Sequence, residues 1–232
     1  MEVPPLFSAL ASAGADPVTA AIAAAREGCD AGLVVFDSAA DRLRAAVVLA
    51  PEVPLAQAAV MLPLFGIGLQ NAFGALAPPE IAVQLGWDGG LSLNGARCGA
   101  LALWAAPRDP GLVPDWLVVG LDLALWDGAD ETGRTPDTTT LAAEGCGEVT
   151  PDILLPAWLR HSLVWLNTWE TDGTAPLLKE WTGLAHGIGA ETVATGRTGR
   201  ALGVDERFGL VLRQENHTVL VPLSDLVKGA TT

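Results

Sequence analysis

The sequence Trp-Asp-Gly-Gly-Leu-Ser-Leu-Asn-Gly-Ala-Arg-Cys-Gly-Ala-Leu, residues 87 to 101, decides the fold. Its Asn-Gly pair is the strongest short signal for a β-hairpin, because both central positions of the turn need a positive φ. Gly89 and Gly90 stand just before the hairpin, where a ligand can approach a backbone that carries no side chains. Arg97 begins the returning strand near these glycines. The residues alone leave two interpretations open: a surface hairpin with an exposed arginine, or a ligand site.

Signals on both sides of the hairpin predict an α+β core. Asp16-Pro17 combines a capping residue with a proline suited to the first helical turn, and predicts a helix that ends near Gly28. Thr150-Pro151-Asp152 predicts a second helix, to about Glu170, in the same way. Further helices are expected over 54–76 and 175–184, strands over 31–36, 43–49, 81–87 and 116–125, and the hairpin over 91–104. Hairpins mixed with longer connections predict a largely antiparallel or mixed sheet.

The chain changes character from about His186. Glycines there separate short β-type runs at 192–195, 200–204, 209–213 and 218–223. Such closely spaced short strands are typical of a small barrel-like module. The sequence therefore predicts a main domain over 1–185 and a small β module over 186–232. The polar segment 128–140, rich in Asp, Gly and Thr, is expected to be a surface loop.

Composition excludes several classes of function. A formal net charge of −14 argues against nucleic acid as a partner, since phosphate binding needs clustered Lys and Arg. The apolar stretch 55–76 is long enough to span a bilayer, but Pro63, three amide side chains and the lack of flanking basic residues favour a buried core helix. Three widely spaced cysteines make neither a disulfide framework nor a metal motif. The first ten residues lack a basic segment before an apolar run, so we expect no signal peptide and a cytoplasmic protein.

Residues 87 to 101 resemble the central motif of the biotin/lipoate protein ligase family. That motif runs Lys-Trp-Pro-Asn-Asp, then a hairpin, then a catalytic lysine ten residues after the tryptophan. Here Trp87 is followed at the same spacing by Arg97, and Gly89 and Gly90 stand at the Asn-Asp pair. The resemblance implies a class II synthetase/biotin ligase-like mixed sheet flanked by helices. It also implies that Arg97 occupies the catalytic position.

The resemblance extends along most of the chain. Residues 116–123 are similar to the family's strand ending in Gly-x-Gly-x-Asn, which lines the acid pocket; Gly120 matches the first glycine and Asp122 replaces the second. Residues 200–212 resemble the SH3-like C-terminal module of biotin ligases, and we expect no N-terminal DNA-binding domain of the kind that the bifunctional members carry. The implied substrate-binding residues are Trp87, Gly89, Gly90, Gly99, Gly120 and Asp122.

The family's reaction implies the partners. ATP, with Mg²⁺, activates biotin, lipoate or an octanoate-type acid as an acyl-adenylate, and a lysine of a biotinyl or lipoyl carrier domain then attacks it. In this chain the Gly-Arg-Gly-Arg type loop that wraps the adenylate is reduced to Asp37-Ser-Ala-Ala-Asp-Arg42, which removes the usual phosphate cradle. Arg97 keeps the charge of a lysine but is planar and does not transfer protons.

Three functions therefore remain open from the sequence. The first is an active ligase that binds a small carboxylic acid or its acyl-adenylate and joins it to a carrier lysine. The second is a catalytically inactive binding protein on the ligase scaffold. The third is an ATP-independent acyltransferase in which Cys146 is the nucleophile, a role that requires a thiolate.

Overall fold

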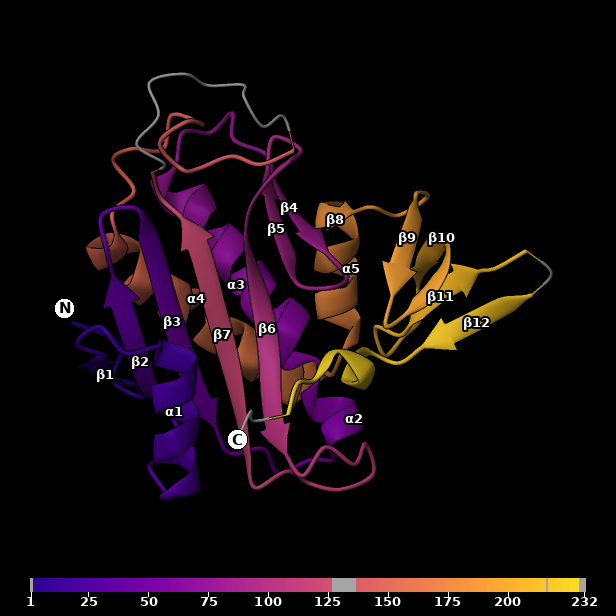
Figure 1. Cartoon of the computed structure of the whole chain (residues 1–232), viewed down its shortest axis with the longest axis horizontal. Helices are drawn as coiled ribbons and strands as arrows, with labels where there is room; N and C mark the ends of the chain where they lie inside the picture. Colours follow the sequence, from indigo (N-terminus) through magenta and orange to yellow (C-terminus); the bar gives the residue numbers. More distant parts are fainter. Residues whose placement is uncertain (1, 127–136, 216, 230–232) are drawn as a thin grey trace.

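An eight-stranded mixed sheet forms the core of the computed structural model, which describes residues 2–126, 137–215 and 217–229 (Figure 1). The strand order is β1-β2-β3-β7-β6-β5-β4-β8. The bounds are β1 Ser8–Ala11, β2 Leu33–Ser38, β3 Arg42–Leu49, β4 Val83–Gly86, β5 Gly90–Leu93, β6 Ala96–Ala106, β7 Trp116–Ala124 and β8 Ala185–His186. The pairs β1–β2 and β4–β8 are parallel and the other neighbours antiparallel, so the predicted mixed sheet is confirmed.

The predicted hairpin joins β5 to β6. Asn94 and Gly95 have φ angles of 49° and 91°, the positive values that a two-residue turn of this kind requires. The strand pairing shifts between Leu91 and Ser92, so that one residue of β6, Cys98, is extra. Because of this bulge, the Arg97 side chain does not follow the alternation between the two faces of the sheet that the later residues of β6 keep.

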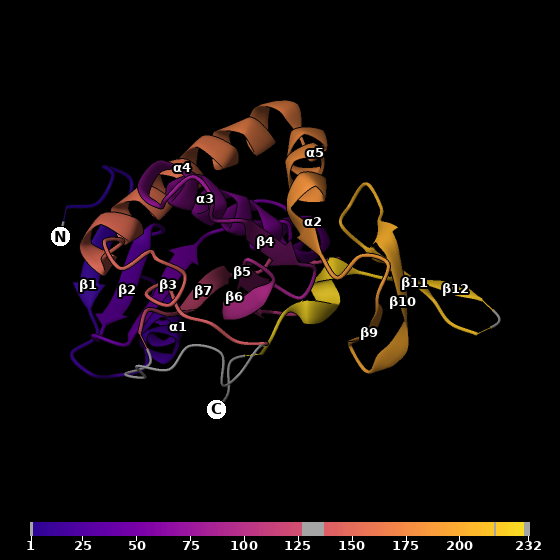
Figure 2. The same ribbon diagram turned by 90° about the horizontal axis from the view of Figure 1, so that it is seen from above.

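Helices cover both faces of the sheet (Figure 2). The helix α1, Pro17–Arg26, lies on one face, and its start is capped as predicted, because the Asp16 side chain accepts a hydrogen bond from the Thr19 N–H at 2.8 Å. The other face carries α2 Leu55–Ala58, α3 Met61–Leu76, α4 Pro151–Asp172 and α5 Ala175–Leu184. Phe65 and Trp158 join α3 to α4 through an edge-on ring contact with centroids 5.6 Å apart.

The continuous helix predicted over 54–76 is wrong in one respect, because the structure breaks it between α2 and α3. Pro63 has no N–H to donate to the carbonyl of Ala59, four residues earlier, and its ring crowds that carbonyl. The Ala59 carbonyl instead accepts from the Leu62 N–H at 3.0 Å. By length and composition Leu55–Leu76 is able to cross a membrane, yet 72% of its most apolar window is buried inside the protein, as expected of a core helix.

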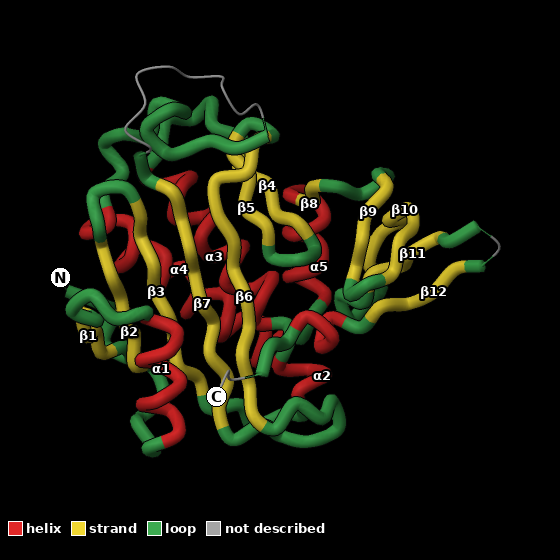
Figure 3. Tube along the Cα trace, in the orientation of Figure 1, coloured by secondary structure: helices red, strands yellow, loops and turns green. Residues whose placement is uncertain are grey.

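The C-terminal region forms a second, four-stranded antiparallel sheet in the order β12-β11-β10-β9 (Figure 3). Its elements are β9 Glu191–Ala194, β10 Arg197–Val204, β11 Leu210–Arg213, β12 Thr218–Val221 and the 3-10 helix η1 Leu223–Leu226. This sheet is compatible with the predicted SH3-like module. Most of the loop expected over 128–140 lies outside the described residues.

The C-terminal module is attached to the core by specific contacts. The Trp87 indole N–H donates to the Phe208 carbonyl at 2.7 Å, and the Phe208 ring packs edge-on against Trp181 at 5.8 Å. The chain then returns alongside β6, where Lys228 forms a parallel bridge with Trp104. Core and module thus share one set of buried residues.

Candidate functional site

Three central strands present small side chains on the face that carries α1. Strand pairing aligns residues of β3, β7 and β6 in rows across the sheet, and alternate residues of each strand share a face. Three rows result: Arg44, Asp122 and Ala100; Ala46, Gly120 and Ala102; and Val48, Val118 and Trp104. The middle row is short in every strand, and this leaves open space above the sheet beside α1.

A groove of about 530 Å³ occupies that space. Its lining residues are Asp16, Pro17, Val18, Thr19, Ile22, Ala23, Arg26, Arg44, Ala100, Ala102, Trp104, Gly120, Leu121, Asp122 and Lys228. One wall is therefore α1 and the other is the Trp104 end of β6 with the returning C-terminal segment. A mostly apolar floor with a few polar groups at the rim is the usual composition of a small-molecule site of this size.

Gly120 is required by the packing of the groove floor. A Cβ at this position would lie 2.7 Å from Cζ3 of Trp104 and 3.0 Å from Cγ2 of Val18. The absence of a side chain lets the Trp104 ring and α1 lie close over β7. The glycine that the sequence predicted as a substrate-binding residue therefore lines the groove and sets its depth.

The groove rim is more positive than the chain as a whole. Its lining includes three cations and two carboxylates, whereas the chain has a formal net charge of −14. Arg44 is held by Asp37, with Nη2 2.6 Å from Oδ2, and this hydrogen bond is the main reason that the pKa of Arg44 is raised. Asp122 pairs with Arg42, Oδ1 to Nε, at 2.8 Å. Such a rim favours an anionic ligand over a cationic one.

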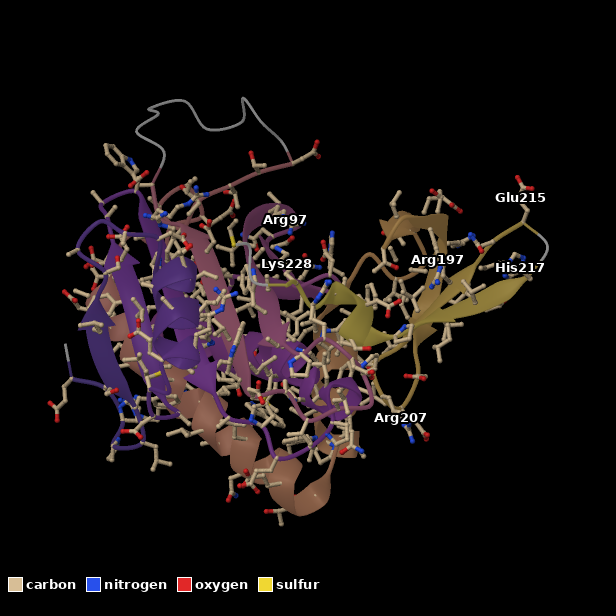
Figure 4. All side chains as sticks on the ribbon, turned by 60° about the horizontal axis from the view of Figure 1, so that its bottom comes forward. Arg97, Arg197, Arg207, Glu215, His217 and Lys228 are labelled. Carbon is tan, nitrogen blue, oxygen red and sulfur yellow. The ribbon has the colours of Figure 1, made fainter. Side chains whose placement is uncertain are left out.

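Arg97 lies on the same face of the sheet but outside the lining of the groove. Gly90 pairs with Ala100, and a Cβ on Gly90 would lie 3.1 Å from Nη1 of Arg97, so the guanidinium lies over Gly90. Half of the Arg97 side chain is exposed, and its Nη1 is 3.4 Å from Oδ2 of Asp88. Figure 4 shows Arg97 and Lys228 on the core, apart from Arg197 of the module.

The structure separates the other predicted substrate-binding residues from the groove. Trp87, Gly89 and Gly90 border a void of about 10 Å³ on the face covered by α3, which is too small for a ligand. The space beside Gly89 is occupied by the backbone of Leu101 and by the side chain of Leu62. Gly99 packs against the β7 backbone at Asp122. Of the predicted set, Gly120 and Asp122 line the groove, while Gly90 and Arg97 lie beyond its polar end.

Cys146 and Cys98 are buried on the face covered by α3. Burial raises the pKa of Cys98 to about 12 and is also the main cause of the raised pKa of Cys146, which is 1% exposed. Both thiols are therefore held protonated at neutral pH, the unreactive form. This geometry argues against the acyltransferase alternative.

We expect native protein to expose at most Cys29 to a thiol reagent at pH 8, and three thiols to react after unfolding. The half-buried Cys29 also has a raised pKa, so its reaction should be slow. The absorbance of the thiolate released from an aromatic disulfide reagent measures how many thiols have reacted, and rapid reaction of Cys146 in native protein would contradict its burial as an unreactive thiol.

The raised pKa of Cys98 also makes stability depend on pH. Its contribution to stability is present below pH 9 and is lost as the pH rises toward 12, because the thiol of the unfolded chain releases its proton first.

Three residues that line the groove were not predicted as site residues: Arg44, Trp104 and Lys228. None of them belongs to a recognisable motif. The alternating small residues of β6 and β7 contained a usable signal for an open sheet face. Lys228 is close to Trp104 only because the chain returns through the module, and no local pattern shows this.

The connection between β2 and β3 does not fit a triphosphate. It consists of residues 39–41 without a glycine, and the Ala39 N–H is already bonded to the Arg42 carbonyl at 3.0 Å. One of its three backbone N–H groups is therefore already used, and the connection has no glycine of the kind that lets backbone N–H groups converge on an anion. Within residues 2–126, 137–215 and 217–229, no three His, Cys, Asp or Glu side chains gather as a metal site.

Comparisons with known proteins match both parts of the chain. A family model described as "Biotin/lipoate A/B protein ligase family" matches residues 3–183, and one described as "Domain of unknown function (DUF4444)" matches residues 188–228. A biotin--[acetyl-CoA-carboxylase] ligase from Paracoccus denitrificans is 27% identical over 194 residues, which cover 79% of this chain and 78% of the relative.

Solved structures agree with the fold. A biotin protein ligase-like protein of unknown function from Silicibacter sp. TM1040 is 53% identical, with a TM-score of 0.91 over 98% of this chain and 99% of that one. The biotin protein ligase from Aquifex aeolicus in complex with biotin and ATP is 17% identical, with a TM-score of 0.67 over 93% and 94% of the two chains. The latter likeness supports the fold alone.

Proposed function

The chain belongs to the Biotin/lipoate A/B protein ligase family, and on that premise we propose that it binds a small carboxylic acid, or the acyl-adenylate of such an acid, in the groove beside α1. The acids we propose are of the biotin, lipoate or octanoate type. The observation that carries the proposal is the groove itself, with an apolar floor of small residues and a rim that is net positive in an acidic chain.

The shape of the groove suits an elongated ligand. The rows of Ala100 and Trp104 are four residues apart on β6, or about 13 Å at the rise of a β-strand. Between them lie Gly120 and Ala102, over which an apolar chain or ring loses contact with water. Burying such a group contributes about 25 cal/mol for each Å² of apolar surface. A cation at the rim then balances the acid's charge.

We favour binding without adenylation, because the β2–β3 connection does not fit the phosphates of ATP. The second candidate is ATP-dependent attachment of the acid to a lysine of a biotinyl or lipoyl carrier domain. The observation that favours it is the position of Arg97, at the family's catalytic lysine and over Gly90. If this candidate holds, ATP with Mg²⁺ supplies the activating group and Arg97 stabilises its charge. Acid-dependent exchange of pyrophosphate into ATP tests it.

Calorimetric titration with biotin, lipoate and octanoate in turn tests the proposed binding. We expect one acid to bind one site per chain with a Kd below about 100 µM, a binding free energy of roughly 5.5 kcal/mol. Absence of binding by all three acids at millimolar concentration would overturn the proposal. The matching uncharged alcohol or amide serves as the control, and it should bind more weakly because it lacks the carboxylate.

The remaining assignments follow from the same proposal. We place the ligand site in a core of residues 1–185 and treat residues 186–232 as the appended module. We propose a cytoplasmic location, since the three cysteines are unpaired, as is usual in a reducing compartment.

A further inference from the structure

We infer that Lys228, brought to the groove by the C-terminal segment, binds the carboxylate of the acid. The inference rests on the proposed function and names the residue that holds the ligand's charge. It also assigns the C-terminal module a direct part in the site. It predicts that the carboxylate lies at the Trp104 end of the groove rather than at the Arg97 end.

The backbone of Lys228 is fixed on the sheet. Its N–H donates to the Leu103 carbonyl at 2.8 Å, and its carbonyl accepts from the Ala105 N–H at 3.2 Å. These bonds extend the sheet at the part of β6 that lies beyond its pairing with β5. Because the main chain makes them, a change of the Lys228 side chain leaves the attachment intact.

The side chain of Lys228 is directed to the wall of the groove. Its ammonium nitrogen lies 5.0 Å from the centroid of the Trp104 ring, and both residues line the groove. The ring in turn lies over Gly120 at the floor. A cation–π contact orients an ammonium group without neutralising it, so Lys228 is held in place and keeps its charge for a ligand.

Three other cations near the groove already have carboxylate partners. Arg44 pairs with Asp37, Arg42 with Asp122 and Arg97 with Asp88. For Lys228, no carboxylate of the described part of the chain lies within 4.0 Å of the ammonium. Arg26 also lacks such a partner, but it stands in the last turn of α1, where the negative end of the helix dipole favours a cation.

The carboxylate of a ligand binds most tightly to a cation that no carboxylate of the described residues already pairs with. At Arg97 or Arg44 the ligand must compete with an aspartate of this chain, whereas at Lys228 it meets a charge that no carboxylate of the described residues pairs with and that lies against an aromatic ring. A hydrogen bond to a charged group contributes more than a neutral one, and its removal reduces affinity by roughly 10- to 100-fold. The site is open to solvent, so added salt should weaken binding.

Three substitutions test the inference by calorimetric titration with the acid that binds best among biotin, lipoate and octanoate. Lys228→Met keeps an unbranched apolar stem over Trp104 and removes the charge, and we expect it to weaken binding at least about tenfold. Lys228→Arg should lose less, because it keeps the charge. The matched control is Lys179→Met, which removes the other lysine of the chain from an exposed position on α5 and should not change affinity.

Binding of the carboxylate at the Arg97 end would give a different result in the same titrations. If Arg97→Met abolishes binding while Lys228→Met binds like the wild type, the carboxylate lies at the polar end and the inference is overturned. If the wild type binds none of the three acids, the proposed function fails together with it. If Lys228→Met alone loses affinity, the result supports both the proposed function and the role of Lys228.

Nuclear magnetic resonance gives an independent readout on the unmutated site. Reductive ¹³C-methylation labels two lysines and the terminal amine, and Lys179→Arg assigns the signals. In the free protein the Lys228 signal should be shifted by the Trp104 ring current. On titration with the acid the Lys228 signal should move again while the Lys179 signal stays. A Lys228 signal that does not move at saturation would overturn the inference.

Discussion

Replacing Ala102 with leucine is expected to reduce the affinity for the bound acid by about 10- to 100-fold. Ala102 stands beside Gly120 in the middle row of the groove floor, where three added carbon atoms take the place of the ligand's apolar body. Forcing extra carbon atoms into a filled site costs about 1–3 kcal/mol, and each 1.4 kcal/mol is a tenfold change in affinity. Calorimetric titration measures the loss.

The fold should tolerate this substitution. Ala102 is half-buried on the wall of an open groove, so the free energy of unfolding should change by less than about 0.5 kcal/mol. The matched control is Ala190→Leu, which adds the same side chain to an exposed position of the module. Equal affinity of Ala102→Leu and wild type would show that the acid binds elsewhere.

Wild-type protein is expected to show no acid-dependent exchange of pyrophosphate into ATP with biotin, lipoate or octanoate. The reason is the connection between β2 and β3, whose three residues include no glycine, and in which the Ala39 N–H is already bonded to the Arg42 carbonyl. Electrostatic stabilisation of a transferring group is usually the largest single contribution to catalysis, so its loss should bring the rate below detection. Incorporation of labelled pyrophosphate into ATP measures the rate.

In the same assay, the variant Arg97→Lys separates inactivity caused by the Arg97 side chain from inactivity caused by the β2–β3 connection. We expect this variant to be silent as well, since the β2–β3 connection is unchanged. Exchange by Arg97→Lys alone would mean that one side chain blocks an otherwise complete site, and that the β2–β3 connection is not the cause of inactivity. Exchange by the wild type with one acid would establish an adenylating ligase and identify its substrate.

Local chemistry made much of the fold predictable. The Asn94-Gly95 turn and the Asp16 cap follow from residues adjacent in sequence, and both are confirmed. The edge strands β1 and β8 were not expected, because they have four and two residues and depend on neighbouring strands for their pairing. The break before α3 was also missed, although Pro63 gave a sufficient signal for it.

The candidate site was less predictable, because it depends on register and on a distant part of the chain. Gly120 and Asp122 were predicted as substrate-binding residues on one strand, and both line the groove, which leaves their role a prediction. Trp87 occupies the motif position of a site residue, yet its indole bonds to the module at Phe208. The contact between Lys228 and Trp104 joins residues far apart in sequence, and only the folded chain brings them together.

Photolabelling tests the location of the acid most directly. A medium-chain fatty acid that carries a diazirine is bound, irradiated and located by peptide mass spectrometry, with unlabelled octanoate as competitor. We expect competed labels on the groove strands, within residues 100–104 and 118–122, or on α1. Competed labels confined to the opposite face, around Leu62 and Trp87, would contradict binding of the acid in the groove.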